Sequence, residues 1–565
     1  MPSVWRACPQ RHRPDSICQV PSMPPFPDGR LTDRISSGAR APARTPPKNA
    51  HTVSTSRQPN RDTLMSVPEL DRGTIAADNS AAEPARAAAQ DSSPPRSMRP
   101  LIMRLHFYAG ILVAPFLLIA TISGGLYAIA PTLEQVLYRD LLHVDSTGPA
   151  LPVAEQVRAA QQLRPDLTVS AVRPASEVGE TTRVLFTDPS LGESERTAVF
   201  IDPATASSTG QSVVYGSSSA LPVRTWISQL HRHLHLGEPG RIYSELAASW
   251  LWVIALGGVY LWVQRYRTQR TRTRQSARLL TFDRGARGRN RTLGWHGTTG
   301  LWIAVGLIFL SATGLTWSTY AGANVGELRT ALSWTTPTLD TTLGVSDTAP
   351  ADGGHDGHDG HTAAVTDTGA LDRNVGALDR VLAAAAEHRV TEHVEMSIPA
   401  DGHTAVTVTE TRQPWQFVTD AVAIDPATGA VTATNTFADW PLAAQLTTWG
   451  IALHMGILFG LLNQLVLLAL AVALGTVIVR GYQLWWQRRP TRGSRRVARP
   501  PLRGTWRRLH PVTVVAVVAA AVTVGWFAPL LGLSLLAFLL VDVAVGLLRR
   551  RRSPEHSPEG TSATG

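Results

Sequence analysis

The sequence predicts an α-helical polytopic membrane protein with six spans, an internal duplication and two outer α+β domains. Three observations support this prediction: apolar segments long enough to cross a bilayer, arginine concentrated on one side of them, and two halves with matching motifs. Hydrophobic residues make up 44% of the 565 residues, and they are concentrated in these segments.

Residues 1–97 contain no apolar run and are rich in Pro, Ser, Ala and Arg. We expect a disordered N-terminal tail, without the apolar core of a signal peptide. The two cysteines, Cys8 and Cys18, both lie in this tail. Residues after the tail are therefore not expected to contain a disulfide, a cysteine-ligated iron–sulfur cluster or a c-type haem.

Six segments have the composition of membrane spans: roughly 101–130, 246–264, 296–317, 447–479, 511–526 and 529–548. A spanning helix needs about 20 mostly apolar residues, and the last two segments are shorter. They are joined near Phe527-Ala528-Pro529 and are expected to form a tight helical hairpin. The alternative for this pair is a single interfacial segment.

Arginine placement orients the spans. Segment 264–295 carries ten Arg and one acidic residue, and segment 480–510 carries ten Arg and no acidic residue. The long loops are the reverse, with seven Arg and eleven acidic residues in 131–225, and five and seventeen in 318–441. Because basic flanks stay in the cytoplasm, both termini are expected there and both long loops outside. The net charge of +10 follows this topology, so the expected partner is membrane lipid and not nucleic acid.

Each long loop has the pattern of a small α+β domain. Apolar and polar residues alternate over 182–186 and 404–409, which predicts strands, and stretches near 152–163 and 370–388 predict helices. Asp202-Pro203 and Asp425-Pro426 each open a sequence typical of a hairpin turn.

These assignments divide the chain into eleven parts. They are a tail (1–97), span 1 (98–130), outer domain 1 (131–225), a His segment with span 2 (226–264), a basic loop (265–295), span 3 (296–317), outer domain 2 (318–441), a His segment with span 4 (442–480), a second basic loop (481–510), the hairpin of spans 5 and 6 (511–548) and a cytoplasmic tail (549–565).

The duplication is clearest near the cytoplasmic ends of spans 1 and 3. His106 and His296 are each followed four residues later by a glycine, Gly110 or Gly300. That glycine lies on the same helix face as the histidine and leaves room for a flat macrocycle. Ser123-Gly124 and Thr313-Gly314 then follow at matching distances.

The outer ends of spans 2 and 4 match in the same way. Leu230-His231 and Leu453-His454 are each followed six residues after the histidine by a glycine. The repeated unit is therefore a span, an outer domain, a His segment and a second span, with spans 5 and 6 as an addition.

The repeat places one histidine pair near each membrane face. An ionisable side chain at membrane depth is a functional candidate, and neutral imidazole is an axial ligand of haem iron. We expect two bis-histidine b-type haems, held by His106 with His296 and by His231 with His454, that pass electrons across the membrane. A single His near an interface is more often only a hydrogen-bonding residue, but four in register favour haem. His233 and His235 compete with His231, and His235 is the main alternate.

These motifs resemble a known family. Leu-His-Arg-His-Leu-His-Leu-Gly-Glu-Pro-Gly-Arg at 230–241, Leu-His-x-Gly-x-x-x-Gly at 453–460 and the Asp-Pro-x-Thr-Gly turn are similar to the PepSY-associated transmembrane family of bacterial iron-regulated proteins and ferric-siderophore reductases. The resemblance covers roughly 100–490. It implies PepSY-type domains outside the bacterial cytoplasmic membrane, buried haem with the four histidines as ligands, and reduction of ferric siderophores in iron acquisition. The first Asp-Pro turn departs from the pattern, since it has Ala206 in place of Gly.

A further motif lies in the second loop, where His355, His358 and His361 alternate with Asp and Gly. Such a segment binds Zn²⁺, Cu²⁺ or Ni²⁺ weakly, and the alternative is a solvated low-complexity insertion. It leaves the metal of the substrate open, with copper as one option.

The expected activity is that of a haem-dependent ferric reductase whose catalytic residues the sequence does not identify. Neither a G-x-G-x-x-G nor a Walker motif is present, so the electron donor would be a quinol, a flavin reductase or another protein. Two alternatives are a non-catalytic regulator of an extracytoplasmic peptidase and an accessory protein for metal uptake. The spans have almost no acidic residues before Asp542, which weighs against the latter.

Overall fold

The computed structural model describes residues 98–272, 278–344, 368–488 and 510–551. Within them, five helices are long and apolar enough to cross a membrane: Ala114–Leu137, Glu238–Thr271, Gly288–Leu315, Gly460–Trp486 and Pro529–Leu548. The chain is thus a multi-pass membrane protein. Pro511–Phe527 is apolar but has only 17 residues, so the sixth span stays a prediction. The N-terminal tail lies outside the described residues.

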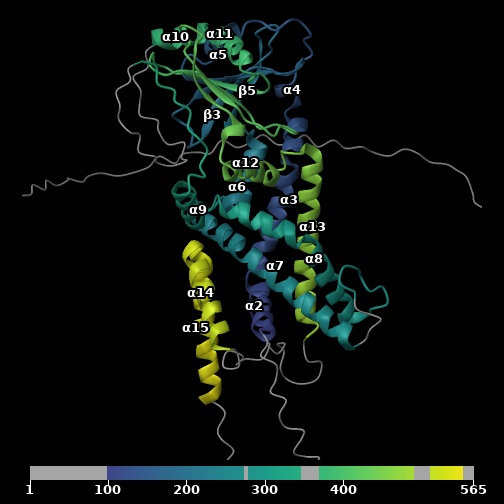
Figure 1. Cartoon of the computed structure of the whole chain (residues 1–565). Coiled ribbons are helices and arrows are strands. Elements are labelled where there is room, and N and C mark those ends of the chain that lie inside the picture. The colour runs from purple at the N-terminus through teal and green to yellow at the C-terminus, as the bar shows by residue number, and fades with distance from the viewer. Residues whose placement is uncertain (1–97, 273–277, 345–367, 489–509, 552–565) are drawn as a thin grey trace, which may run out of the picture. The chain divides into compact units, whose positions relative to one another are not determined.

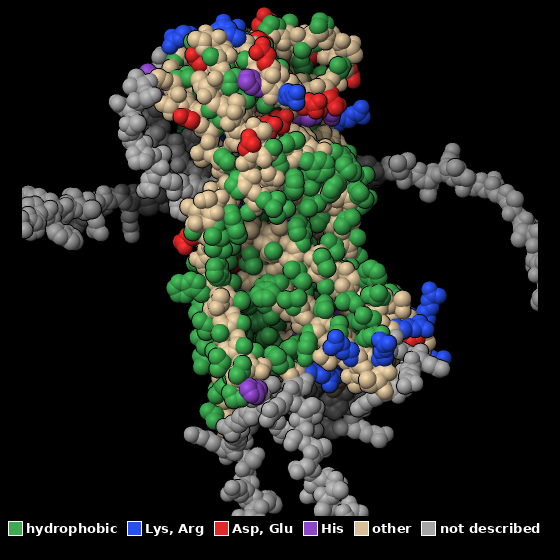
Figure 2. Space-filling view, viewed as in Figure 1, with side chains coloured by type: hydrophobic (Ala, Val, Ile, Leu, Met, Phe, Trp, Pro, Cys, Tyr) green, Lys and Arg blue, Asp and Glu red, His purple; other side chains and the backbone are tan. Residues whose placement is uncertain are grey.

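The helical part consists of these spans and the shorter helices that join them to the outer loops (Figure 1). In chain order its helices are α2 (Arg99–Leu112), α3 (Ala114–Leu137), α6 (Pro222–His233), α7 (Glu238–Arg272), α8 (Gly288–Leu315), α9 (Tyr320–Ala331), α12 (Leu442–His454), α13 (Gly460–Trp486), α14 (Pro511–Phe527) and α15 (Pro529–Arg551). Figure 2 shows hydrophobic side chains over the outer surface of these helices and arginines gathered at the end away from the sheet.

The first expected span is two helices that meet at Val113. Pro115 lies in the first turn of α3 and has no N–H to donate to the carbonyl of Ile111. The Tyr482 hydroxyl of α13 donates to that carbonyl at 3.0 Å instead. A tertiary hydrogen bond therefore compensates the break. The fourth expected span is also divided, because α12 ends at His454 and the long apolar helix begins only at Gly460.

The strands of both outer loops form one antiparallel sheet in the order β4-β3-β2-β1-β5-β6-β7-β8. The first loop supplies β1 (Thr168–Arg173), β2 (Thr182–Thr187), β3 (Glu195–Ile201) and β4 (Ser208–Tyr215), and the second supplies β5 (Val394–Ser397), β6 (Val406–Glu410), β7 (Ala421–Ile424) and β8 (Val431–Asn435). The sequence predicts two outer domains, and the structure joins them edge to edge. Pairing β1 with β5 covers two strand edges that would otherwise be exposed.

Helices cover the sheet face that points away from the membrane helices (Figure 1). They are α5 (Val153–Leu163), α10 (Thr368–Gly376) and α11 (Leu378–Glu387), which confirms both helix predictions. Val157, Val381 and Phe186 belong to one buried cluster between these helices and the strands. On the opposite face, Leu185 and Phe200 pack with Leu142 of the short helix α4 (Arg139–Leu142).

Both Asp-Pro sequences form the predicted hairpin turns. The N–H of Gly429 donates to the carbonyl of Asp425 at 2.8 Å, and the N–H of Ala206 donates to that of Asp202 at 2.9 Å. Gly429 adopts φ of 77° and Ala206 adopts φ of 56°. The first turn therefore holds an alanine in the left-handed region, at a steric cost that glycine avoids in the second.

An ion pair crosses the seam between the two halves of the sheet. Nε of Arg173 on β1 donates to Glu395 of β5 at 2.6 Å, and Nη1 of Arg196 on β3 lies 3.2 Å from the same carboxylate. Burial alone would raise the pKa of Glu395, but the two arginines hold it below the ordinary value of 4.5. The ionised carboxylate therefore stabilises the seam.

We expect Glu395→Gln to lower the free energy of unfolding by about 2 kcal/mol at neutral pH, the scale of a hydrogen bond to a charged group. Because the folded pKa is lowered, this stabilisation is present above 4.5 and is lost as the pH falls through the folded value. Thermal unfolding in detergent should show a gap between wild type and variant that narrows with acidification. Glu177→Gln, at an exposed loop position, is the control. Equal effects of the two substitutions would contradict the role of Glu395.

Candidate functional site

His106 of α2 and His296 of α8 lie beside each other inside the helical part. Their ring centres are 6.2 Å apart, with the ring planes at 75°. Nδ1 of His106 lies 3.0 Å from the carbonyl oxygen of Ile254 on α7. Nδ1 of His296 lies 2.9 Å from the carbonyl oxygen of Val477 on α13. We refer to these two histidines as the inner pair.

These contacts determine the tautomer of both rings. A carbonyl oxygen can only accept, so each Nδ1 must carry the proton and donate it. In a neutral imidazole the other nitrogen, Nε2, then keeps its lone pair. Both inner histidines therefore present an Nε2 that can bind a metal ion.

His231 of α6 and His454, the last residue of α12, form the outer pair. Nδ1 of His231 lies 2.9 Å from Oγ of Ser123 on α3, and Nδ1 of His454 lies 2.6 Å from Oγ1 of Thr313 on α8.

The hydroxyl groups that contact the outer pair also have backbone acceptors. Oγ of Ser123 lies 3.0 Å from the carbonyl oxygen of Ile119, and Oγ1 of Thr313 lies 2.9 Å from that of Phe309. A hydroxyl that donates to its carbonyl accepts from the histidine Nδ1, and Nε2 then keeps its lone pair, as in the inner pair.

A glycine lies against each ring. A Cβ on Gly258 would come within 3.1 Å of the His106 ring, and one on Gly124 within 3.0 Å of the His231 ring. The corresponding distances are 3.4 Å from Gly481 to His296 and 3.9 Å from Gly314 to His454. A Cβ at Gly258 or Gly124 would therefore press on the imidazole, whereas one at Gly481 or Gly314 would make only an ordinary van der Waals contact. Gly110 and Gly300 face open space within 4 Å, which is compatible with the room predicted there.

Ser123 and Thr313, the partners of the outer pair, lie further along the expected spans 1 and 3 than His106 and His296. Ser123 follows His106 at the same separation in the sequence as Thr313 follows His296. At the helical rise of ~1.5 Å per residue, this separation corresponds to about 25 Å, close to the thickness of a bilayer core. The outer pair is on the side of the sheet.

The alternate outer ligands lie elsewhere. His235 is exposed, and its Nε2 lies 3.1 Å from the carbonyl oxygen of Trp226. The His233 ring centre is 6.0 Å from that of His235. Burial and, to a smaller extent, the positive charge of Arg232 lower the pKa of His233. The geometry therefore favours His231 as the partner of His454. His355, His358 and His361 lie outside the described residues.

The donor set of the inner pair is compatible with a haem. In the described part of the chain, no group of three or more His, Cys, Asp or Glu could hold a metal ion. A pair of imidazoles is sufficient where a porphyrin supplies the other four nitrogens. Two imidazoles on opposite sides of one iron, with bonds of about 2 Å, have ring centres roughly 6 Å apart, as in the inner pair. Hydrogen bonding of the second ring nitrogen is typical of metal-ligating histidine.

Several supporting residues were missed from the sequence. Gly258 and Gly481 follow the two outer histidines at equal separations, so the repeat spacing could have identified them. Tyr127 and Trp317, whose rings lie 6.3 Å from His231 and 5.7 Å from His454, also occupy matching positions one helical turn after Ser123 and Thr313. The carbonyl groups of Ile254 and Val477 carry no side-chain signal, and only the structure identifies them.

A model of the family described as the PepSY-associated TM region matches residues 103–488. The match includes both histidine pairs and the whole sheet, and it ends before α14. No curated protein matches the chain.

Proposed function

The chain belongs to the PepSY-associated transmembrane family, and from that premise we propose that it transfers electrons across a bacterial cytoplasmic membrane to a ferric complex outside. It would hold two b-type haems, one in the inner pair and one in the outer pair. The observation that carries this proposal is the matched environment of the four imidazoles, each with Nδ1 bonded and Nε2 available.

The protein's own groups prepare each site. The carbonyl groups of Ile254 and Val477 and the hydroxyl groups of Ser123 and Thr313 fix ring orientation and tautomer before any metal binds. Haem iron with two imidazole ligands exchanges one electron between its ferric and ferrous forms. A quinol or a reduced flavin gives up two electrons and two protons, so one donor molecule supplies the electrons for two Fe³⁺ ions.

The topology proposed from the sequence gives this transfer its direction. Six spans in a duplicated arrangement would put both termini and the basic connections in the cytoplasm, where the donor is oxidised. The PepSY region would lie outside, above the outer pair. Ferrous ion released there would be available for uptake.

A reduced-minus-oxidised visible spectrum of the detergent-purified chain tests the proposal. We expect the bands of a b-type cytochrome and, by pyridine haemochrome assay, about two haems per chain. Stoichiometric re-oxidation of the dithionite-reduced protein by a ferric chelate should follow. A colourless protein from haem-replete cells would overturn the proposal and favour peptidase regulation.

A further inference from the structure

A large cavity lies between the sheet and the membrane helices. Its volume is about 2060 Å³, larger than most small-molecule sites. The hydroxyl groups of Ser397, Thr407 and Thr409 border it on the sheet side. These residues alternate with buried apolar residues on β5 and β6, so the face toward the helices is polar. The cavity is therefore suited to a hydrated, polar ligand.

Arg224 of α6 borders this cavity, and two of its three guanidinium nitrogens lack a hydrogen-bond acceptor. It is only 7% exposed, and its Nη1 lies 3.5 Å from Glu134. Its Nε and Nη2 are buried without a partner among the described residues. An unmade hydrogen bond of a buried charged group is costly, so an acceptor bound here would be stabilised.

Arg183 and Arg412 border the same cavity. No carboxylate of the described residues lies within 4.0 Å of either guanidinium. Burial and, to a smaller extent, the positive charge of Arg173 lower the pKa of Arg183 to about 10. Burial also lowers the pKa of Arg412, whose side chain is nevertheless accessible from within the cavity. Bound negative charge would offset both effects.

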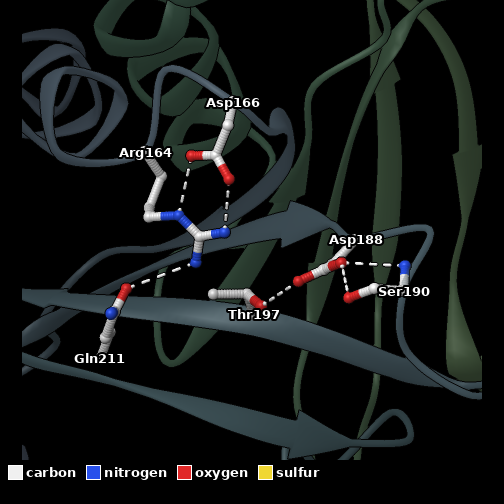
Figure 3. Close-up of polar contacts among 6 residues, drawn as sticks. All are labelled: Arg164, Asp166, Asp188, Ser190, Thr197 and Gln211. Atoms are coloured by element: carbon white, nitrogen blue, oxygen red, sulfur yellow. Dashed lines mark hydrogen bonds and ion pairs between the residues drawn. The ribbon is translucent and has the colours of Figure 1, made fainter. Parts of the chain in front are cut away.

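Six of the seven carboxylates that border the cavity accept hydrogen bonds from groups of the protein. Glu395 is shared by Arg173 and Arg196, and Glu134 accepts from the N–H of Leu221 at 2.7 Å. Asp188 accepts from the N–H of Ser190 and from Oγ1 of Thr197, each at 3.0 Å (Figure 3).

Three of the other four acidic groups accept hydrogen bonds from the backbone. Glu180, Glu195 and Glu410 accept from the N–H groups of Ser176, Gly192 and Asp420, respectively. Glu193 is exposed. The carboxylates around the cavity therefore do not take up all the hydrogen-bond donors of Arg183, Arg224 and Arg412.

The cavity extends to the residues that follow His454. Met455 and Gly456, which border it, directly follow His454. The loop between β6 and β7 is fixed against this corner, because the N–H of Trp415 donates to the carbonyl of Leu458 at 2.7 Å. Arg412 is in the same loop, so a ligand bound to it lies on the side of the outer pair.

We propose that this cavity binds an anionic ferric chelate rich in carboxylate groups, with Arg183, Arg224 and Arg412 as its guanidinium donors. Arginine matches carboxylate with paired, charge-assisted hydrogen bonds. This inference rests on the proposed function for the fate of the iron, but the binding step itself needs no haem. It also predicts poor binding of cationic chelates.

Gallium(III) citrate tests the binding step, because Ga³⁺ resembles Fe³⁺ but is not reduced under these conditions. Isothermal titration calorimetry of the full chain in detergent should detect binding that weakens with salt. We expect Arg183→Gln and Arg412→Gln each to weaken it about tenfold. Neither residue has an ion pair to lose, so both variants should fold. Arg158→Gln, exposed on α5 across the sheet, is the matched control.

Each outcome decides the inference. Equal weakening by Arg158→Gln, no binding of gallium citrate, or tighter binding of the cationic gallium complex of desferrioxamine B would overturn it. Free citrate that binds as well as the chelate would overturn the chelate assignment. A haem assay on the same samples separates the two proposals. If the protein binds gallium citrate but contains no haem, the binding proposal is supported and the electron-transfer proposal is overturned. If it contains haem but does not bind gallium citrate, the electron-transfer proposal is supported and the binding proposal is overturned.

Discussion

Replacing His296 with alanine is expected to lower the haem content of the purified chain from about two per chain to about one. A b-type haem has no covalent link to the protein, so loss of one of two axial imidazoles removes much of its binding energy. His106→Ala should have the same effect, because its ring centre is 6.2 Å from that of His296. His454→Ala should empty the other site. The pyridine haemochrome assay measures all of these.

Combining variants tests the pairing. His106→Ala with His296→Ala should still retain one haem, whereas His296→Ala with His454→Ala should retain almost none. His235→Ala is the matched control, since His235 is exposed and bonded to the Trp226 carbonyl. Full haem content in His296→Ala would refute the inner site. Haem loss in His235→Ala but not in His231→Ala would move the outer ligand to His235.

Sequence spacing was enough to group the four histidines, because each helix carries its residues at a fixed rise. The equal separations from His106 to Ser123 and from His296 to Thr313 were visible without a structure. Which groups fix Nδ1 was not visible, because Ile254 and Val477 contribute only backbone carbonyls.

The union of the two outer loops also could not be predicted. The strands β1 and β5 lie far apart in the sequence, with two membrane helices between them, and their pairing covers only Ala171 with Ser397 and Val172 with Met396. Alternation of apolar and polar residues predicts strands but not which edges meet. The cavity depends on this union, since its lining combines residues of both loops with the ends of the helices.

The largest stability effect is expected at the contact between α2 and α15. Asp542 of α15 forms an ion pair with Arg104, and the side chains are 26% and 8% exposed, respectively. Nearby, Nε1 of Trp250 donates to Ser534 at 2.9 Å. The family match ends at 488, so α14 and α15 lie outside the matched region.

Asp542→Leu should therefore lower the free energy of unfolding by about 3 to 5 kcal/mol, because it leaves the Arg104 cation buried without its counter-ion. Arg104→Leu should lower the free energy of unfolding by a similar amount, because it leaves the Asp542 carboxylate without its counter-ion. The double variant, with leucine at both positions, should recover most of the loss, since replacing a buried pair by apolar residues is often neutral. Thermal unfolding of the four proteins in one detergent gives the double-mutant cycle. If the two single losses in the free energy of unfolding simply add in the double variant, the pair is not coupled. For comparison, Ser534→Ala removes only one hydrogen bond and should lower the free energy of unfolding by about 1 kcal/mol. Haem content should stay unchanged in the double variant, because the inner histidines are held by the carbonyl oxygens of Ile254 and Val477 and not by this ion pair.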